Sequence, residues 1–370
     1  MKVQHSLMMF QESLRSKESI KTYTWTVDQF IKYRNLKKKN YDSTVAMEKK
    51  ELQSMVETYV IHLKRTIGPN SISTYANHLK TFLESNDIDL NWRKIKRLYP
   101  AMVKRSGHSA YTTEDVQKML NATTPLKNRA VIHFLTSTGV RIGAVPDLSF
   151  KHLRDMPLGC KMVTVYENST EEYQTFLTPE ATKALDDYLE ERKKHNEILD
   201  DESPLFRERY LLGITKPKRV TKTSLQALLR RSIQKTTVRG QKKNGRYAEQ
   251  LAHGFRKRFN TVLKLNKEVN DNVIEKMMGH KRGLDGTYLV ITPEMAFNEF
   301  KNGIMDLTMD GTARKQAELD QANKDKSELQ KKVDEIKDMK RQQEDENARR
   351  DQALEYLMKK EKERESKSQV

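Results

Sequence analysis

The stretch EKMMGHKRGLDGTYL, residues 275–289, joins a Gly-His pair to a tyrosine eight residues later. A tyrosine beside basic groups can stack on a partner, pack in a core or act as a nucleophile. A lone tyrosine in a glycine-flanked loop is usually a packing residue, so the segment does not decide among these roles. The sequence around Gly279, His280 and Tyr288 has to do so.

The chain as a whole is strongly basic. Its 370 residues carry a formal net charge of +18, and 32% of them are charged while only 36% are hydrophobic. This balance favours a polyanionic partner, and nucleic acid is the first choice because neutralised phosphates release counterions. A merely soluble basic protein is the alternative. The length suits two ordinary domains, and the charged content predicts a solvated appendage beside them.

Cysteine usage and hydropathy exclude other classes of protein. Cys160 is the only cysteine, so an internal disulfide and a cysteine-rich zinc site are excluded. No stretch approaches the roughly 20 apolar residues that a spanning helix needs, and the N-terminus has no cleavage-site pattern. We therefore expect a soluble, cytoplasmic protein without a membrane partner.

The first hundred residues predict a small all-helical domain, because apolar residues recur there at helical spacing. The stripes are Ile20, Tyr23, Val27 and Phe30; Leu52, Met55, Val56, Tyr59, Val60 and Leu63; and Ile72, Tyr75, Leu79 and Phe82. Gly68-Pro69 separates the second stripe from the third, and Asn70 or Ser71 is expected to cap the third helix. This domain spans 1–100, and residues 101–112 are interpreted as a linker.

Residues 113–305 predict a second domain with mixed structure. Thr112 and Thr113, followed by Glu114 and Asp115, are typical of a helix start. In residues 161–179, β-branched and aromatic residues flank a polar Glu-Asn-Ser-Thr turn, which predicts a β-hairpin. The expected fold is therefore mostly α with a small β-sheet.

Residues 312–370 differ in kind, since they are dense in Lys, Glu, Gln and Asp. A heptad register runs from Leu319 to Leu357, but its middle is polar, so a single solvated helix and a weak coiled coil remain equally open. Either way, the segment predicts a charged helical tail.

Two further short motifs lie upstream of the opening stretch. In LTSTGVRIGAVPDLSFKHL (135–153), a helix ending at Thr138-Gly139 would present Arg141 just past a turn. In LAHGFRKRFNT (251–261), His253 and Arg256 are three residues apart and share a helix face. Each motif is weak by itself, because such an arginine is usually a surface residue and such a pair usually a solvated face.

Taken together and in this order, Arg141, His253, Arg256, His280 and Tyr288 resemble the tyrosine recombinase family of phage-type integrases and chromosomal dimer resolvases. The phrases NDIDLNW and MMGHKRGLDGTYL are most similar to archaeal members. The resemblance implies a helical, SAM-like core-binding domain and an α+β catalytic domain that close around double-stranded DNA. It also implies a site-specific recombinase, or integrase, that is nucleoid-associated and acts as a homotetramer on paired DNA sites.

The chemistry of these residue types suits such a reaction. Two permanently charged guanidinium forks, Arg141 and Arg256, can hold the non-bridging oxygens on which transition-state charge accumulates. A phenol with a pKa near 10 is a poor nucleophile at neutral pH, so Tyr288 needs nearby positive charge and a base. The resemblance assigns proton acceptance to His253, a phosphate hydrogen bond to His280, and a 3′-phosphotyrosine to Tyr288. No metal-ligand set lies near the motifs, so we expect no metal and no cofactor. Because the covalent intermediate keeps the energy of the DNA bond, we also expect rejoining to need no ATP.

One departure from the family leaves the function open. Its members usually carry a lysine in the hairpin turn as general acid, whereas here no lysine occurs between Lys161 and Lys183, and Thr170 lies near the expected place. Lys161 could reach in, another basic group could substitute, or protonation could be impaired. A DNA-binding protein of the same fold with weakened catalysis and a type IB topoisomerase-like nicking enzyme therefore remain alternatives.

Two other segments also leave alternatives open. The basic stretch 216–247 predicts an amphipathic helix and loop, either a solvated face or a surface that follows DNA phosphates. The apolar residues of 290–307 predict a helix. It could pack on its own domain, or it could dock onto a neighbouring protomer, as the resemblance to the family implies.

Overall fold

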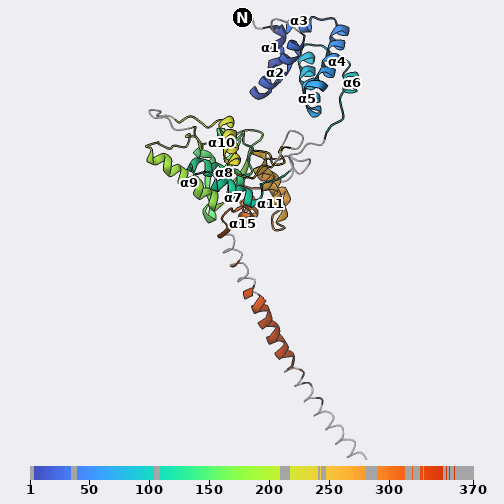
Figure 1. The fold of residues 1–370 in the computed structure, drawn as a ribbon. Coiled ribbons are helices and arrows are strands. Elements are labelled where there is room, and N and C mark those ends of the chain that lie inside the picture. The colour runs from blue at the N-terminus through green and yellow to red at the C-terminus, as the bar shows by residue number, and fades with distance from the viewer. Residues whose placement is uncertain are drawn as a thin grey trace, which may run out of the picture. The chain divides into compact units, whose positions relative to one another are not determined.

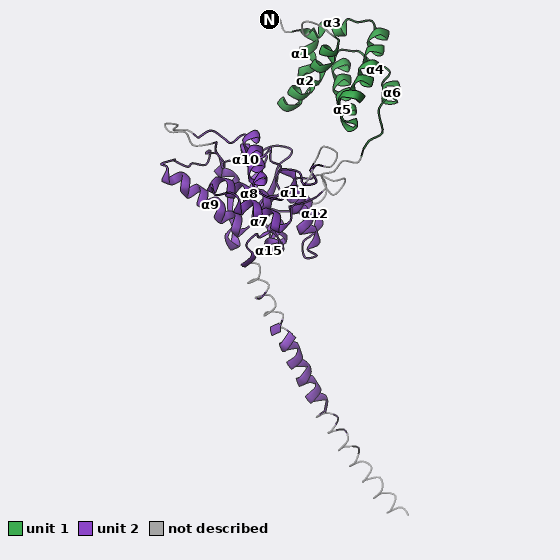
Figure 2. Cartoon of the chain, viewed as in Figure 1, with its two compact units in different colours: residues 1–105 green, residues 106–370 purple. Residues whose placement is uncertain are grey.

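The computed structural model describes residues 4–34, 40–103, 109–208, 217–240, 242, 247–280 and 290–312, and then residues 319, 326–327, 329–344, 347, 350 and 354. The chain divides into two compact units, residues 1–105 and 106–370 (Figure 2).

The described part of unit 1–105 is built from helices (Figure 1). They are α1 His5–Glu12, α2 Lys17–Tyr33, α3 Asp42–Val45, α4 Lys49–Thr66, α5 Pro69–Glu84 and α6 Trp92–Lys96. The predicted stripes supply its core, in which Val27, Phe30, Val56 and Phe82 are fully buried. Burial of these faces is what stabilises short helices that would be marginal alone.

The start of α5 differs from the expected cap. Gly68 is the N-cap and Pro69 is the first helical residue, so neither Asn70 nor Ser71 caps the helix. Proline suits this position because its fixed φ is helical and its missing N–H would have no intrahelical partner. The Asn70 side chain instead bonds both backbone groups of Val103, at 2.8 and 2.9 Å.

Unit 106–370 combines helices with a small sheet. Its helices are α7 Thr113–Asn121, α8 Leu126–Thr138, α9 Pro179–Lys194, α10 Lys222–Gln234, α11 His253–Leu265, α12 Asp271–Met277, α14 Pro293–Asn302 and α15 Ile304–Leu307, with the 3-10 turns η1 Val145–Asp147, η2 Phe150–His152 and η3 Pro157–Gly159. The strands β1 Leu153–Met156, β2 Cys160–Val165 and β3 Tyr173–Leu177 form an antiparallel sheet in the order β1-β2-β3. The prediction of a mostly α fold with a small β-sheet is confirmed.

The hairpin predicted within 161–179 corresponds to β2 and β3, in a register that pairs Val165 with Tyr173 and Lys161 with Leu177. The sequence did not reveal β1, because Leu153–Met156 is a short strand with two charged residues that are both exposed. The helix start at Thr112 is as predicted, because Thr112 and Asp115 form a reciprocal capping box.

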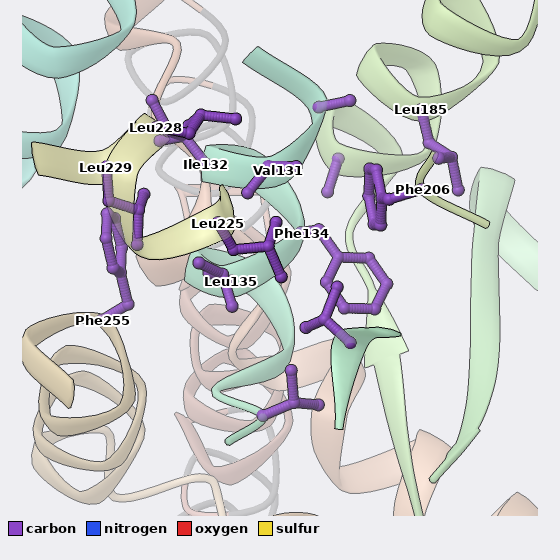
Figure 3. Close-up of a cluster of buried hydrophobic side chains, with 14 of the residues drawn as sticks. Val131, Ile132, Phe134, Leu135, Leu185, Phe206, Leu225, Leu228, Leu229 and Phe255 are labelled. Atoms are coloured by element: carbon purple, nitrogen blue, oxygen red, sulfur yellow. The ribbon is translucent and has the colours of Figure 1, made fainter. Parts of the chain in front are cut away.

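Helix α8 lies at the centre of this unit's core and every residue from Ala130 to Thr138 is buried. Figure 3 shows Phe134 beside Phe206, and Phe255 of α11 near the leucines of α10. The Phe134 and Phe206 rings meet edge-to-face with centroids 5.4 Å apart. A helix buried on all sides is fixed in place, and so is the turn at its C-terminal end.

Two segments near the C-terminus complete the unit. Phe297 and Phe300 of α14 are buried and pack against Phe176 of β3, so this helix packs on its own unit. The described residues of 312–370 are helical and exposed, and they do not test the coiled coil. Among all residues that the structure describes, no helix is both long and apolar enough to cross a membrane.

Candidate active site

Three segments far apart in the sequence meet around Arg256, which is 3% exposed. Its guanidinium donates to the Gly139 carbonyl at 2.8 Å and to the Met278 carbonyl at 2.5 Å. Its Nη2 also lies 2.8 Å from Nε2 of His280. The end of α8, the first turns of α11 and the end of α12 are therefore joined by one side chain.

The Gly139 turn depends on glycine. Gly139 ends α8 with a φ of +59°, which disfavours residues with a side chain. A Cβ placed there would come within 2.7 Å of the Phe259 ring. This close approach of the turn to α11 brings the Gly139 carbonyl within reach of Arg256.

The Gly279-His280 turn is equally tight. Gly279 has a φ of +64°, and a Cβ there would lie 2.4 Å from the Tyr173 ring. The His280 ring is held by Glu275, whose Oε2 lies 2.5 Å from Nδ1. The other carboxylate oxygen of Glu275 pairs with Nζ of Lys264. The glycine in the opening motif therefore has a packing reason.

Arg141 is exposed just past the Gly139 turn, as expected. Its charge lies close enough to Arg256, His253 and Tyr173 to influence the pKa of each. Arg219 holds the loop after Arg141, because it donates to the Leu148 carbonyl at 3.1 Å and to Ser149 Oγ at 2.7 Å. In the sequence, Arg219 stood out only as one of many basic residues in 216–247. No periodicity in the sequence signals such a tie.

His253 is the first residue of α11 and is exposed. Partial burial of the ring lowers its pKa, and Lys257, Arg256, Arg141 and His280 lower it further. A histidine whose pKa lies below its usual value is neutral at pH 7, which is the form that can accept a proton.

Tyr173 is a residue of this site that the sequence reasoning missed. It begins β3, is 6% exposed and lies under Gly279. Burial raises the pKa of its phenol, while the charges of Arg256 and Arg141 oppose that effect. Although Arg256 is near, the hydroxyl makes no hydrogen bond of acceptable geometry with the part of the chain that the structure describes. The only signal in the sequence was an aromatic residue at a strand start.

The predicted nucleophile Tyr288 lies outside the described residues, so the five predicted site residues are placed only in part. Arg256 and His280 are in contact, and Arg141 and His253 lie near enough to act on neighbouring charges.

The hairpin turn carries acids rather than a lysine. Glu167 lies 3.5 Å from His152 Nε2 and 3.9 Å from Lys151 Nζ. Lys161 is at the opposite end of β2 from the turn, roughly 13 Å from Val165 at about 3.3 Å per residue. Its Nζ pairs with Asp155 at 2.6 Å. The idea that Lys161 reaches into the site is therefore wrong.

Across the described ranges, no group of three or more His, Cys, Asp or Glu side chains comes together as a metal ion would require.

A family model described as the Phage integrase family matches residues 109–284 of this chain. Among solved structures, the chain is similar to a lambda integrase tetramer bound to a Holliday junction, with 15% identity, a TM-score of 0.50, and coverage of 76% of this chain and 75% of that one. It is also similar to XerH site-specific recombinase bound to difH substrate in a pre-cleavage complex, with 17% identity, a TM-score of 0.49, and coverage of 76% and 78%. At these identities the likeness concerns the fold. A search of curated proteins found no match.

Proposed function

We propose that this chain is a tyrosine recombinase that cuts and rejoins DNA at specific sites through a 3′-phosphotyrosyl bond at Tyr288. The observation that carries the proposal is the contact between Arg256 and His280 at the end of α8, beside Arg141 and His253. These residues fall within the segment that matches the integrase family model. An archaeal affiliation stays a prediction from the phrases NDIDLNW and MMGHKRGLDGTYL.

In the proposed reaction, Arg141 and Arg256 bind the non-bridging oxygens of the scissile phosphate. The phenol oxygen of Tyr288 attacks phosphorus and its proton passes to His253. The bond to the 5′-oxygen breaks, and that oxygen takes up a proton from water to leave as a free 5′-hydroxyl. The Arg256 fork is suited to this role because two backbone carbonyls fix its plane before any substrate arrives, so little reorganisation is needed. The phosphodiester energy stays in the covalent bond, so rejoining needs no ATP.

The partner that we propose is double-stranded DNA, bound by a homotetramer on paired sites in the nucleoid. Helix α10 and its C-cap Lys235 support a DNA-facing surface. Lys222, Arg230, Arg231 and Lys235 are exposed there, and no described carboxylate lies within ion-pairing distance of them. We assign core binding to residues 1–100, the link to 101–112, catalysis to 113–305 and a charged tail to 312–370.

A test without knowledge of the target site uses a pool of random-sequence duplexes, each nicked near its centre so that the released fragment diffuses away and the covalent adduct accumulates. Adducts captured on denaturing gels are sequenced. We expect a defined motif for the wild-type chain and no adduct for Tyr288→Phe. An adduct that survives this substitution would mean that another residue is the nucleophile. Unchanged yield in EDTA is expected if no metal takes part.

A second candidate is a DNA-binding protein of this fold without strand transfer. The hairpin favours it, since the turn lacks a lysine and Lys161 is held by Asp155. Selection of a bound motif from the same pool without any adduct would support this candidate. Relaxation of supercoiled plasmid without recombinant product would instead support a type IB topoisomerase-like enzyme.

A further inference from the structure

His280 occupies a hydrogen-bonding position that fixes where its proton lies. An arginine side chain has five donors and no acceptor, so the 2.8 Å contact from Arg256 Nη2 requires His280 Nε2 to accept. The ring proton must then be on Nδ1, where the Glu275 carboxylate lies 2.5 Å away and accepts it. In the DNA-free protein His280 is therefore the neutral Nδ1-protonated tautomer.

This tautomer has no hydrogen on Nε2, so Nε2 cannot donate a hydrogen bond to a phosphate. For His280 to bind a phosphate oxygen through Nε2, the contact with Arg256 must break and Nε2 must take up a proton from solvent. The resulting imidazolium would keep its Nδ1–H bond to the Glu275 carboxylate, and that negative charge stabilises it.

We propose that Glu275 is a positioning residue for phosphate binding, because its carboxylate keeps the His280 proton on Nδ1 and stabilises the imidazolium that forms when Nε2 protonates against the scissile phosphate. The proposal rests on the recombinase function proposed above. Glu275 is 9% exposed and its side chain points to both Lys264 and His280, so it is held on two sides. Phosphate binding should then take up about one proton, and affinity should fall as pH rises.

Several charged or titratable groups contact His280 or lie beside its immediate neighbours, and they contribute to this balance. They are Glu275 on α12, Lys264, Arg256 and His253 on α11, Arg141 after α8, and Tyr173 on β3. Glu275 is the only carboxylate among these six. Its removal should therefore disfavour the imidazolium more than any other single substitution of the set.

Glu275→Gln gives a sharp expectation because Lys264 can only donate. The new amide oxygen would turn toward Lys264, which places the NH₂ group against His280 Nδ1. That nitrogen must then accept, so the ring proton moves to Nε2 and faces the N–H of Arg256. A switch of tautomer is expected from a change of one atom.

Nitrogen-15 spectra of histidine-labelled full-length protein without DNA measure this directly. We expect His280, assigned by loss of its signals in His280→Gln, to be protonated on Nδ1 in the wild type and on Nε2 in Glu275→Gln. Glu268→Gln, the same change at an exposed residue between α11 and α12, should leave the signals in place. A wild-type His280 protonated on Nε2, or signals unmoved by Glu275→Gln, would overturn the proposal.

The functional arm measures adduct formation against pH on the motif selected from the random pool. Glu275→Gln should lower the rate about 10- to 100-fold, as for carboxylates that orient metal-bound histidines. It should also move the alkaline limb of the pH profile to lower pH, whereas Glu268→Gln should not. A wild type that forms adducts with an unchanged profile in Glu275→Gln refutes the role of Glu275. No adduct from the wild type refutes the recombinase proposal, and the spectra still decide whether Glu275 fixes the His280 proton.

Discussion

At the centre of the candidate site, Arg256 joins three segments that are distant in the sequence. Its contacts with the Gly139 and Met278 carbonyls use the flat geometry of the guanidinium, which donates along fixed directions. A lysine has one terminal nitrogen and cannot reach both carbonyls and His280 together. Arg256 therefore provides a fixed donor geometry in addition to its charge.

Arg256→Lys should lower the rate of adduct formation by about 100-fold or more, the range seen when one aligned transition-state donor is lost. The measurement is single-turnover cleavage of the selected nicked duplex. Arg154→Lys is the matched control, because Arg154 is exposed and its ion pair with Glu294 lies at the surface. Equal rates for Arg256→Lys and the wild type would show that the guanidinium fork of Arg256 is not needed for the reaction.

Tyr173→Phe tests the hydroxyl under Gly279, which has no hydrogen-bond partner of good geometry among the described residues. A buried polar group without a good partner costs about 1–3 kcal/mol, so its removal should raise the free energy of unfolding of unit 106–370 by about 1 kcal/mol. Both tryptophans, Trp25 and Trp92, lie in the other unit, so hydrogen exchange of α8 peptides is the suitable measurement. A loss of stability would show that the hydroxyl has a partner in solution.

The sequence could predict a site residue only where a short motif marks its position. Arg141, His253, Arg256 and His280 sit in short motifs whose order carries the information, and their roles stay predictions together with that of Tyr288. Glu275 and Tyr173 could not be found in this way. Their positions depend on the side-chain direction of a short helix and on the register of β3, which only the packed chain determines.

At the scale of elements, the buried helix α8 carries a histidine, His133, whose pKa lies well below the usual value for histidine. Burial against α9 lowers the pKa of His133 to about 4, and the charge of Arg129 adds to this. The unfolded chain protonates near pH 6.5, so only the unfolded state takes up the proton as pH falls from 6.5 to 4. Stability is therefore unaffected above pH 6.5 and lost below it, by about 3 kcal/mol in total.

His133→Gln should remove most of this loss, giving unit 106–370 a flatter dependence of stability on pH between 6.5 and 4. Glu180, 4.0 Å from His133 and with a pKa raised by burial, acts in the opposite sense and is present in both proteins. The comparison is made by hydrogen exchange of α8 peptides across this pH range. Parallel curves for the two proteins would mean that His133 is protonated in the folded state.

Elements were predictable where the local pattern matched the packing. The stripes of unit 1–105, the start of α7 and the hairpin of β2 and β3 follow from periodicity and capping. The strand β1 could not be predicted, because its four residues show no strand pattern and are held in place by pairing with β2. The cap of α5 was assigned wrongly because Asn70 satisfies Val103 instead, a contact across 33 residues.

At the scale of the whole molecule, the formal net charge of +18 predicts that affinity for duplex DNA is largely electrostatic. Arg231 in the last turn of α10 and the C-cap residue Lys235 are exposed four residues apart and so share a face that can follow phosphates. If each neutralises one phosphate, replacing both with glutamine lowers the steepness of log affinity against log salt by about 2. Sequence preference should stay the same, because phosphate contacts do not read bases.

Binding to a labelled random duplex across a salt series measures this slope. Lys183→Gln on α9 is the control, since it also removes one exposed positive charge, from a side chain already paired with Asp187. The control should lower affinity at low salt slightly, through net charge, and leave the slope within error. A slope unchanged in Arg231→Gln/Lys235→Gln would place the DNA on another face of unit 106–370, and the function of α10 would then be limited to the core that its leucines build against α8.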